Sequence, residues 1–370
     1  MQISRYSCNE LVRIGITAGL IVAANFSAQQ AQAQTAAQLP TVVVLSTGGT
    51  IAGKGVSTTA LSEYKSGSIL GEELVNAVPE IKQYANVRVE QVINIGSPDI
   101  TLDDWLRIAN RINAIFAGDA SVAGVVITHG TNTLEETAYF LNLTVKHDRP
   151  VVLVGAQRPA TAISADGPLN LLSAIRTAGA SVSRGKGVMI VMNDEINGAR
   201  DVTKSNTYRA EAFRSGELGF LGYVDPDAVV FYRASTKRHT AKSEFDVTSI
   251  KQLPRVSIVY SYIEPDTSPV KALENSGVKG IVFAGTGAGG ISKFEKEAVN
   301  AIQTSESKEK PILVRSNRTG NGRVIARTDY DKIGMIPADN LNPQKARILL
   351  MLALTRTSDS NEIKRMFTEY

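Results

Sequence analysis

Residues 42–53 read VVVLSTGGTIAG. A run of β-favouring apolar residues that leads straight into a glycine turn is typical of a buried parallel strand, which delivers a small side chain to the carboxyl edge of a sheet. Gly48 and Gly49 allow the backbone to turn sharply and leave Thr50 uncovered. Thr50 is therefore a candidate nucleophile, and a phosphate-binding turn or a turn without a chemical role is the alternative.

Strand and helix patterns alternate over most of the remaining chain. Strands are expected over residues 42–46, 87–95, 122–128, 151–155, 187–192, 256–262, 280–284 and 311–314. Helices are expected over 71–77, from 101 and from 135, around 270–274, and over 293–304 and 342–357. The looser stretch 196–245 is interpreted as a hairpin region followed by a linker. This order predicts an α/β fold: a larger N-terminal domain with a mostly parallel sheet flanked by helices, and a smaller C-terminal α/β domain.

The N-terminal segment has the composition of a secretory signal peptide. Arg5 and Arg13 precede an apolar run at 14–24, which is short for a membrane anchor, and Ala31 and Ala33 supply the small residues of a cleavage site. We therefore expect a signal peptide at 1–33, an N-terminal domain at 34–240, a linker at 241–252 and a C-terminal domain at 253–370. Such a leader predicts export to the periplasm. The single cysteine, Cys8, lies in the leader, so the mature chain is expected to have no disulfide.

Composition argues against several classes of function. The 370-residue chain carries 40 Lys and Arg against 36 Asp and Glu, with no long basic run, so nucleic acid is not expected as a partner. No segment after the leader approaches membrane-spanning length, so no membrane association is expected once the leader is cleaved. With three histidines and one cysteine, the chain is expected to hold no metal. The turn at Thr50 lacks the spacing of the nucleotide-binding glycine motifs, and no cofactor is expected.

Two further hydroxyls are predicted to lie near Thr50. Ser97 follows the expected strand at 87–95, and Thr131 follows the one at 122–128. Ligands of parallel sheets bind beyond the carboxyl ends of the strands, so all three side chains are expected at one edge. Three hydroxyls at one edge favour a chemical role more strongly than any one of them alone.

Several segments together resemble one known family. They are TGGTI at 47–51, ITHGTNTLEETA at 127–138, GAQRP at 155–159, SADGP at 164–168, MNDE at 192–195, DVTK at 201–204 and LNPQKAR at 341–347. Their order and spacing are similar to those of the bacterial type II, periplasmic L-asparaginases and glutaminase-asparaginases. The resemblance extends over essentially the whole mature chain.

The resemblance implies a set of site residues. Its catalytic residues correspond to Thr50, Tyr64, Thr131 and Lys204, and its substrate-binding residues to Ser97, Asn132 and, again, Thr131. A threonine hydroxyl needs a neighbour to accept its proton, and a buried lysine with a lowered pKa can serve as that base. The expected reaction is hydrolysis of a small-molecule side-chain amide through a threonine acyl-enzyme, with release of ammonia. The resemblance also implies a homotetramer, and His129 is expected to be structural.

Five positions depart from the family pattern. They are Asn132 where aspartate is usual, Ala288 where asparagine is common, Arg327 near the place of a glutamate supplied by a neighbouring subunit, Pro98 after Ser97, and Gln157 where methionine is frequent. The first three are expected to weaken the capture of a substrate α-ammonium group, because hydrogen bonds to charged groups are the stronger ones.

Three functions remain open on this basis. One is an exported hydrolase of L-asparagine, with L-glutamine as a second substrate, since one methylene changes binding by only about 1–3 kcal/mol. Another is the same chemistry on a related amide that lacks a free α-amine. The last is a periplasmic small-molecule binding protein without catalysis.

Overall fold

The apolar run that begins at Val42 lies in β1 (Thr41–Gly48), which is the second strand from one end of the large sheet. Its side chains alternate between two buried layers. Val43 and Leu45 belong to one hydrophobic cluster, and Val42 and Val44 to another on the opposite face. Burial on both faces explains why the run is continuously apolar rather than alternating with polar residues.

The computed structural model describes residues 38–307 and 309–370. The predicted signal peptide at 1–33, with Cys8, lies outside the described residues. Within the described part, residues 40–370 form one unit with continuous contacts. No helix in that part has the length and apolarity that a bilayer crossing requires.

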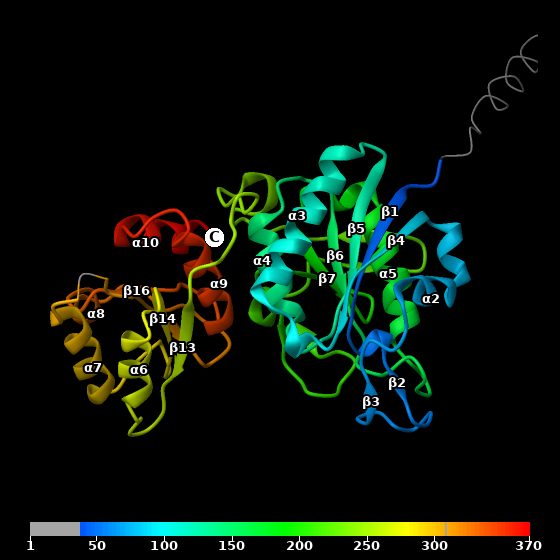
Figure 1. The fold of residues 1–370 in the computed structure, drawn as a ribbon. Helices are drawn as coiled ribbons and strands as arrows, with labels where there is room; N and C mark the ends of the chain where they lie inside the picture. The colour runs from blue at the N-terminus through cyan, green and yellow to red at the C-terminus, as the bar shows by residue number, and fades with distance from the viewer. Residues whose placement is uncertain (1–37, 308) are drawn as a thin grey trace, which may run out of the picture. The chain divides into compact units, whose positions relative to one another are not determined.

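The large sheet has the strand order β12-β11-β8-β7-β6-β5-β1-β4. Figure 1 labels β7, β6, β5, β1 and β4 of this sheet. Its parallel half comprises β4 (Asn86–Ile95), β1, β5 (Val122–Thr128), β6 (Val151–Val154) and β7 (Val188–Met192). The other strands, β8 (Glu195–Gly198), β11 (Gly222–Val224) and β12 (Val229–Phe231), pair antiparallel. The expected hairpin in the stretch 196–245 is the β11–β12 pair.

A tight turn reverses the chain between β7 and β8. Its two residues, Asn193 and Asp194, both have left-handed backbone angles, φ 55° and φ 59°. Asn and Asp tolerate this region, and two successive positive φ values match the twist of a two-residue hairpin.

Helices cover both faces of the large sheet. The cluster containing Val43 and Leu45 includes side chains of α3 (Leu102–Gly118) and α4 (Leu134–Thr144). The opposite cluster includes side chains of α2 (Gly71–Asn76) and α5 (Gly167–Gly179). Helix α5 was not predicted, because it follows a loop of Ser, Ala and Pro without a clear boundary.

A smaller, fully parallel sheet follows in the order β13 (Val256–Tyr260), β14 (Gly280–Gly285), β15 (Ile312–Asn317) and β16 (Met335–Pro337). One face packs on α6 (Ser268–Asn275) and α7 (Lys293–Thr304). The other contributes Val282 and Val314 to the cluster that holds α9 (Pro343–Ala353) and α10 (Ser360–Glu369). The helix expected over 342–357 therefore ends earlier, at Ala353, and α10 was not expected.

Short elements complete the chain. They are β2 (Lys54–Gly55), β3 (Tyr64–Lys65), β9 (Thr203–Lys204), β10 (Phe213–Arg214), α8 (Thr328–Asp331) and the 3-10 turns η1 (Thr50–Ala52), η2 (Pro79–Gln83), η3 (Ser97–Asp99), η4 (Ser181–Ser183), η5 (Gly216–Leu218) and η6 (Thr240–Lys242). The predicted fold class is confirmed: a large, mostly parallel sheet flanked by helices precedes a smaller α/β sheet. The predicted ends of the N-terminal domain, at residue 240, and of the linker, at residue 252, stay predictions.

Candidate active site

Three adjacent parallel strands end at the candidate site. β4, β1 and β5 lie side by side, and the segments that follow them carry Ser97, Thr50 and Thr131. The two glycine turns touch: a Cβ added to Gly49, which has φ +83°, would lie 2.3 Å from the backbone nitrogen of Gly130. Only glycine fits there, so the close approach of the turns requires this residue.

Tyr64 contacts Thr50 directly. Its hydroxyl oxygen lies 2.6 Å from Oγ1 of Thr50. The antiparallel β2–β3 pair brings Tyr64 back over η1, and a Cβ at Gly53 would lie 2.8 Å from the tyrosine ring. The glycine therefore makes room for the ring that carries this hydroxyl to Thr50.

Lys204 contacts Thr131 and Asn132. Its Nζ donates to Oγ1 of Thr131 at 2.8 Å and to Oδ1 of Asn132 at 3.3 Å. Burial lowers the pKa of Lys204 from the ordinary lysine value of 10.5, because desolvation disfavours the charged form. A lysine with a lowered pKa beside a hydroxyl can take up the proton of that hydroxyl.

Glu135 fixes the backbone position of Lys204. Its carboxylate accepts from Oγ1 of Thr203 at 3.0 Å, from the backbone N–H of Lys204 at 3.3 Å and from Nδ2 of Asn342 at 3.4 Å. The side chain is 6% exposed, so these donors replace the water that its carboxylate would otherwise bind. Glu135 thus ties β9 to the start of α4.

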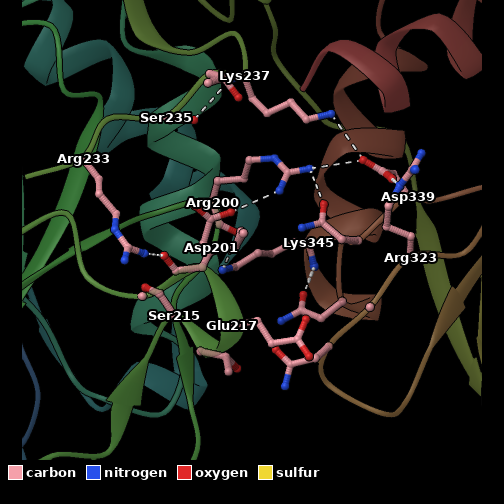
Figure 2. A pocket seen from close by; sticks show the side chains of 18 of the residues that line it. Arg200, Asp201, Ser215, Glu217, Arg233, Ser235, Lys237, Arg323, Asp339 and Lys345 are labelled. Atoms are coloured by element: carbon pink, nitrogen blue, oxygen red, sulfur yellow. Dashed lines mark hydrogen bonds and ion pairs between the residues drawn. The ribbon is translucent and has the colours of Figure 1, made fainter.

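A second cavity, of about 730 Å³, has Thr203 of β9 and Lys345 in its lining (Figure 2). Its buried Lys345 donates to the backbone oxygens of Arg200 and Val202, which precede Lys204. Burial lowers the pKa of Lys345 to about 8. Figure 2 shows Arg200, Lys237 and Arg323 gathered around Asp339. Their nitrogens lie 4.0, 3.3 and 2.5 Å, respectively, from carboxylate oxygens of Asp339. These side chains satisfy one another, and the network holds the segment that leads into Lys204.

His129 supports the second threonine turn from inside the core. Trp105 Nε1 donates to Oγ1 of Thr137 at 2.8 Å, and that hydroxyl lies 2.9 Å from Nε2 of His129. Nδ1 of His129 lies 2.7 Å from the carbonyl oxygen of Gly130, so Nδ1 carries the proton and Nε2 accepts. Burial lowers the pKa of His129 to about 4. The ring is buried, neutral and fully hydrogen-bonded, which is a structural environment.

The candidate pocket has a volume of about 560 Å³. Five of the six predicted site residues line it: Thr50, Tyr64, Thr131, Asn132 and Lys204. Ser97, the sixth, is not among the lining residues and lies beneath Asn132. It is 3% exposed, and its hydroxyl accepts from the backbone N–H of Asn132 at 3.2 Å. The substrate-binding role given to Ser97 stays a prediction.

The other residues that line the pocket were not among the predicted site residues. They are Leu61, Ser62, Glu135, Gln157, Ser205, Asn206, Thr207 and Tyr208. Most lie in the two segments that carry Tyr64 and Lys204, so proximity in sequence was the available signal. Glu135 was expected only as the first residue of a helix.

Two of the departures from the family pattern lie in the C-terminal part of the chain. Ala288 is exposed in the loop after β14, and its carbonyl oxygen accepts from Arg315 at 3.3 Å. Arg327 pairs with Asp329 at 3.1 Å. Neither residue is among those that line the pocket in the described part of this chain. Gln157, in contrast, lines it.

Over residues 38–307 and 309–370, no group of three or more His, Cys, Asp or Glu side chains is arranged to hold a metal ion. The chemistry available in the pocket is that of paired hydroxyls and a half-buried amine. Two hydroxyls, each with a titratable partner, can form and break an ester bond.

Comparison with known proteins places this geometry in a family. A family model for the asparaginase N-terminal domain matches residues 41–237, and one for the glutaminase/asparaginase C-terminal domain matches residues 255–367. The chain belongs to the asparaginase family. The predicted resemblance and the prediction of an amidohydrolase of the L-asparaginase and glutaminase-asparaginase class are confirmed.

Relatives of this asparaginase-family chain match it over most of their length. L-asparaginase 2 of Bacillus subtilis (strain 168) is 48% identical, with 92% of this chain and 89% of the relative covered. The glutaminase-asparaginase of Pseudomonas fluorescens biotype A is 46% identical, with 93% and 94% covered. A crystal structure of a probable cytoplasmic L-asparaginase from Campylobacter jejuni superposes with a TM-score of 0.86 at 46% identity, covering 90% of this chain and 100% of the other.

Proposed function

We propose that this chain hydrolyses the side-chain amide of L-asparagine, and of L-glutamine as a second substrate, to the acid and ammonia through an ester on Thr50. One observation carries the proposal: two threonine hydroxyls line a single pocket, and each has a titratable partner. Oγ1 of Thr50 lies 2.6 Å from the Tyr64 hydroxyl, and Oγ1 of Thr131 lies 2.8 Å from Nζ of Lys204. The names of the L-asparaginase and glutaminase-asparaginase relatives support the choice of substrate.

The first half of the reaction forms the ester. Oγ1 of Thr50 bonds to the carboxamide carbon, and its proton passes to the Tyr64 hydroxyl, which gives its own proton to the leaving nitrogen. The carbon–nitrogen bond breaks and ammonia leaves. Tyr64 ends the step protonated, as it began.

The second half releases the acid. Neutral Lys204 takes a proton through the Thr131 hydroxyl from a water molecule, and the water oxygen bonds to the acyl carbon. The ester bond breaks, and Thr50 regains a proton from Lys204. Burial supports this role, because the lowered pKa of Lys204 makes the neutral amine more accessible near neutral pH than in an exposed lysine.

An ammonia-release assay tests the proposal. Wild type is expected to release ammonia from L-asparagine, Thr50→Ala to release none, and Thr50→Ser, which keeps a hydroxyl, to retain part of the activity. Mass spectrometry of quenched reactions should find the acyl group on the peptide that contains Thr50. Ligand binding without ammonia release by wild type would instead support the periplasmic binding protein.

Export to the periplasm and assembly as a homotetramer are part of the same proposal. A relative from Haemophilus influenzae is named a probable periplasmic L-asparaginase, whereas the Campylobacter jejuni structure is named cytoplasmic. Cell fractionation with N-terminal sequencing should find a periplasmic protein that begins at Gln34. Light scattering should give a mass of four subunits. A cytoplasmic protein would contradict the proposed export, and a monomer would contradict the proposed tetramer.

A further inference from the structure

The candidate pocket has no free carboxylate. Among the described residues that line it, Glu135 is the only acid and Lys204 the only base. Glu135 is 6% exposed, and its carboxylate already accepts from Thr203, Lys204 and Asn342. A cationic group that enters the pocket therefore meets no unpaired anion among the described residues of this chain, and desolvating a charge without an opposite charge is costly.

Asn132 offers the pocket a donor. Its side-chain oxygen accepts from Nζ of Lys204 at 3.3 Å. With this oxygen turned toward Lys204, the Nδ2 hydrogens of Asn132 remain for a ligand. An ammonium group cannot accept from them, whereas an oxygen atom can.

A further amide donor lies in the wall of the same pocket. Nε2 of Gln157 is buried and has no hydrogen-bond partner among the residues that the structure describes. An unpaired buried donor costs free energy, which a ligand oxygen within reach can recover. Asn132 and Gln157 therefore favour the same kind of ligand atom.

We infer that the preferred substrate of this pocket is a primary carboxamide that carries an oxygen acceptor, such as a hydroxyl, at the carbon where an amino acid carries its α-ammonium group. The inference rests on the proposed function and names its substrate class. The chemistry is unchanged: the amide carbon–nitrogen bond breaks, water supplies the new oxygen, and one ammonia leaves with the hydroxy diacid.

The test compares L-asparagine with its hydroxyl analogue, in which OH replaces the α-ammonium group, on the full-length assembled protein. The value of kcat/KM for the analogue should exceed that for L-asparagine by about tenfold or more, the worth of one hydrogen bond gained. A preference for L-asparagine would overturn the inference and leave the proposed function intact. Absence of ammonia release from both amides, and from L-glutamine, would overturn both.

Asn132→Asp tests the residue that carries the argument. A carboxylate at this position accepts from an ammonium group, so the preference should shift toward L-asparagine by about tenfold or more. Asn300→Asp is the matched control: it makes the same chemical change at an exposed asparagine of α7, which is not among the residues that line the pocket. It should keep the wild-type order of substrates, and an equal shift in both variants would contradict the assignment to Asn132.

Gln157→Met keeps the side-chain length and removes the other donor. The value of kcat/KM for the hydroxyl analogue should fall more than that for L-asparagine. An equal fall for both substrates would contradict the part given to Gln157.

Discussion

Nζ of Lys204 lies 2.8 Å from Oγ1 of Thr131, although 73 positions separate the two residues in sequence. Thr131 is placed by the end of β5, and Lys204 by the two-stranded β9–β10 sheet. Glu135 accepts from the backbone N–H of Lys204 in β9, and Lys345 donates to the backbone oxygen of Val202, just before β9.

Lys204 should set the acidic limb of the pH profile. A base works in its neutral form, and burial lowers the pKa of Lys204 below 10.5. Activity should therefore be lost as pH falls through that lowered pKa. Lys204→Arg, which stays charged, should lower kcat by about 10²–10⁴. Steady-state kinetics across pH measure this, with the exposed Lys82→Arg as control. If Lys204→Arg lost activity over the same acidic pH range as wild type, another group would have to be the base.

Tyr64→Phe should remove the partner of the proposed nucleophile. Oγ1 of Thr50 then loses the hydroxyl at 2.6 Å, while the ring can keep its packing on Gly53. We expect kcat to fall by about 10²–10⁴, the usual worth of a positioned proton-transfer group. Tyr84→Phe, at an exposed tyrosine after η2, should behave as wild type. Undiminished kcat in Tyr64→Phe would exclude proton transfer through this hydroxyl.

Gly49→Ala should separate the two threonine turns. The new Cβ would lie 2.3 Å from the backbone of Gly130, so one turn must move and activity should be lost. Gly185→Ala is the control for backbone strain alone: it also has a positive φ, +71°, but no atom lies within 4 Å of the added Cβ. That variant should lose only about 1–2 kcal/mol of unfolding free energy. Comparable activity in the two variants would show that the close approach is dispensable.

Thr137→Val should destabilise the core beneath Thr131. It leaves Nε1 of Trp105 and Nε2 of His129 without a partner, at about 1–3 kcal/mol for each buried group. Thr144→Val is the matched control, because the buried Thr144 hydroxyl donates only to the carbonyl oxygen of Phe140 in its own helix. Chemical denaturation should show the larger loss for Thr137→Val, and equal losses would argue against the network.

Stability should fall as the solution is acidified from pH 6.5 to about pH 4. The pKa of His129 drops from 6.5 to about 4 on folding, so the unfolded chain binds the proton more readily in this range. This difference in pKa between the unfolded and folded chain contributes on the order of 3 kcal/mol to the free energy of unfolding above pH 6.5. That contribution is lost as pH falls toward 4. The slope of unfolding free energy against pH should flatten in His129→Gln. An unchanged slope would place the titration elsewhere.

Much of the fold was predictable because its signals are local. The apolar run of β1 and the glycine turn after it lie within twelve residues, and so do the signals around β5 and Thr131. The β7–β8 hairpin was missed although its signal was present: Asn193 and Asp194 suit a turn with two positive φ values. Helix α5 was missed because its first turn follows a loop without a clear boundary.

The sequence by itself determined the α/β class, the strand ends that carry Thr50 and Thr131, and membership of the asparaginase family. Only the tertiary structure decided what surrounds those hydroxyls. Whether Lys204 is a solvated charge or a base with a lowered pKa depends on desolvation, which distant segments supply. Likewise, the occupied oxygen of Asn132 follows from Lys204, which lies 72 positions away. The spacing of apolar residues along the sequence predicts which face of a helix or strand is buried. The hydrogen-bond partner of a polar group, in contrast, depends on the folded chain as a whole.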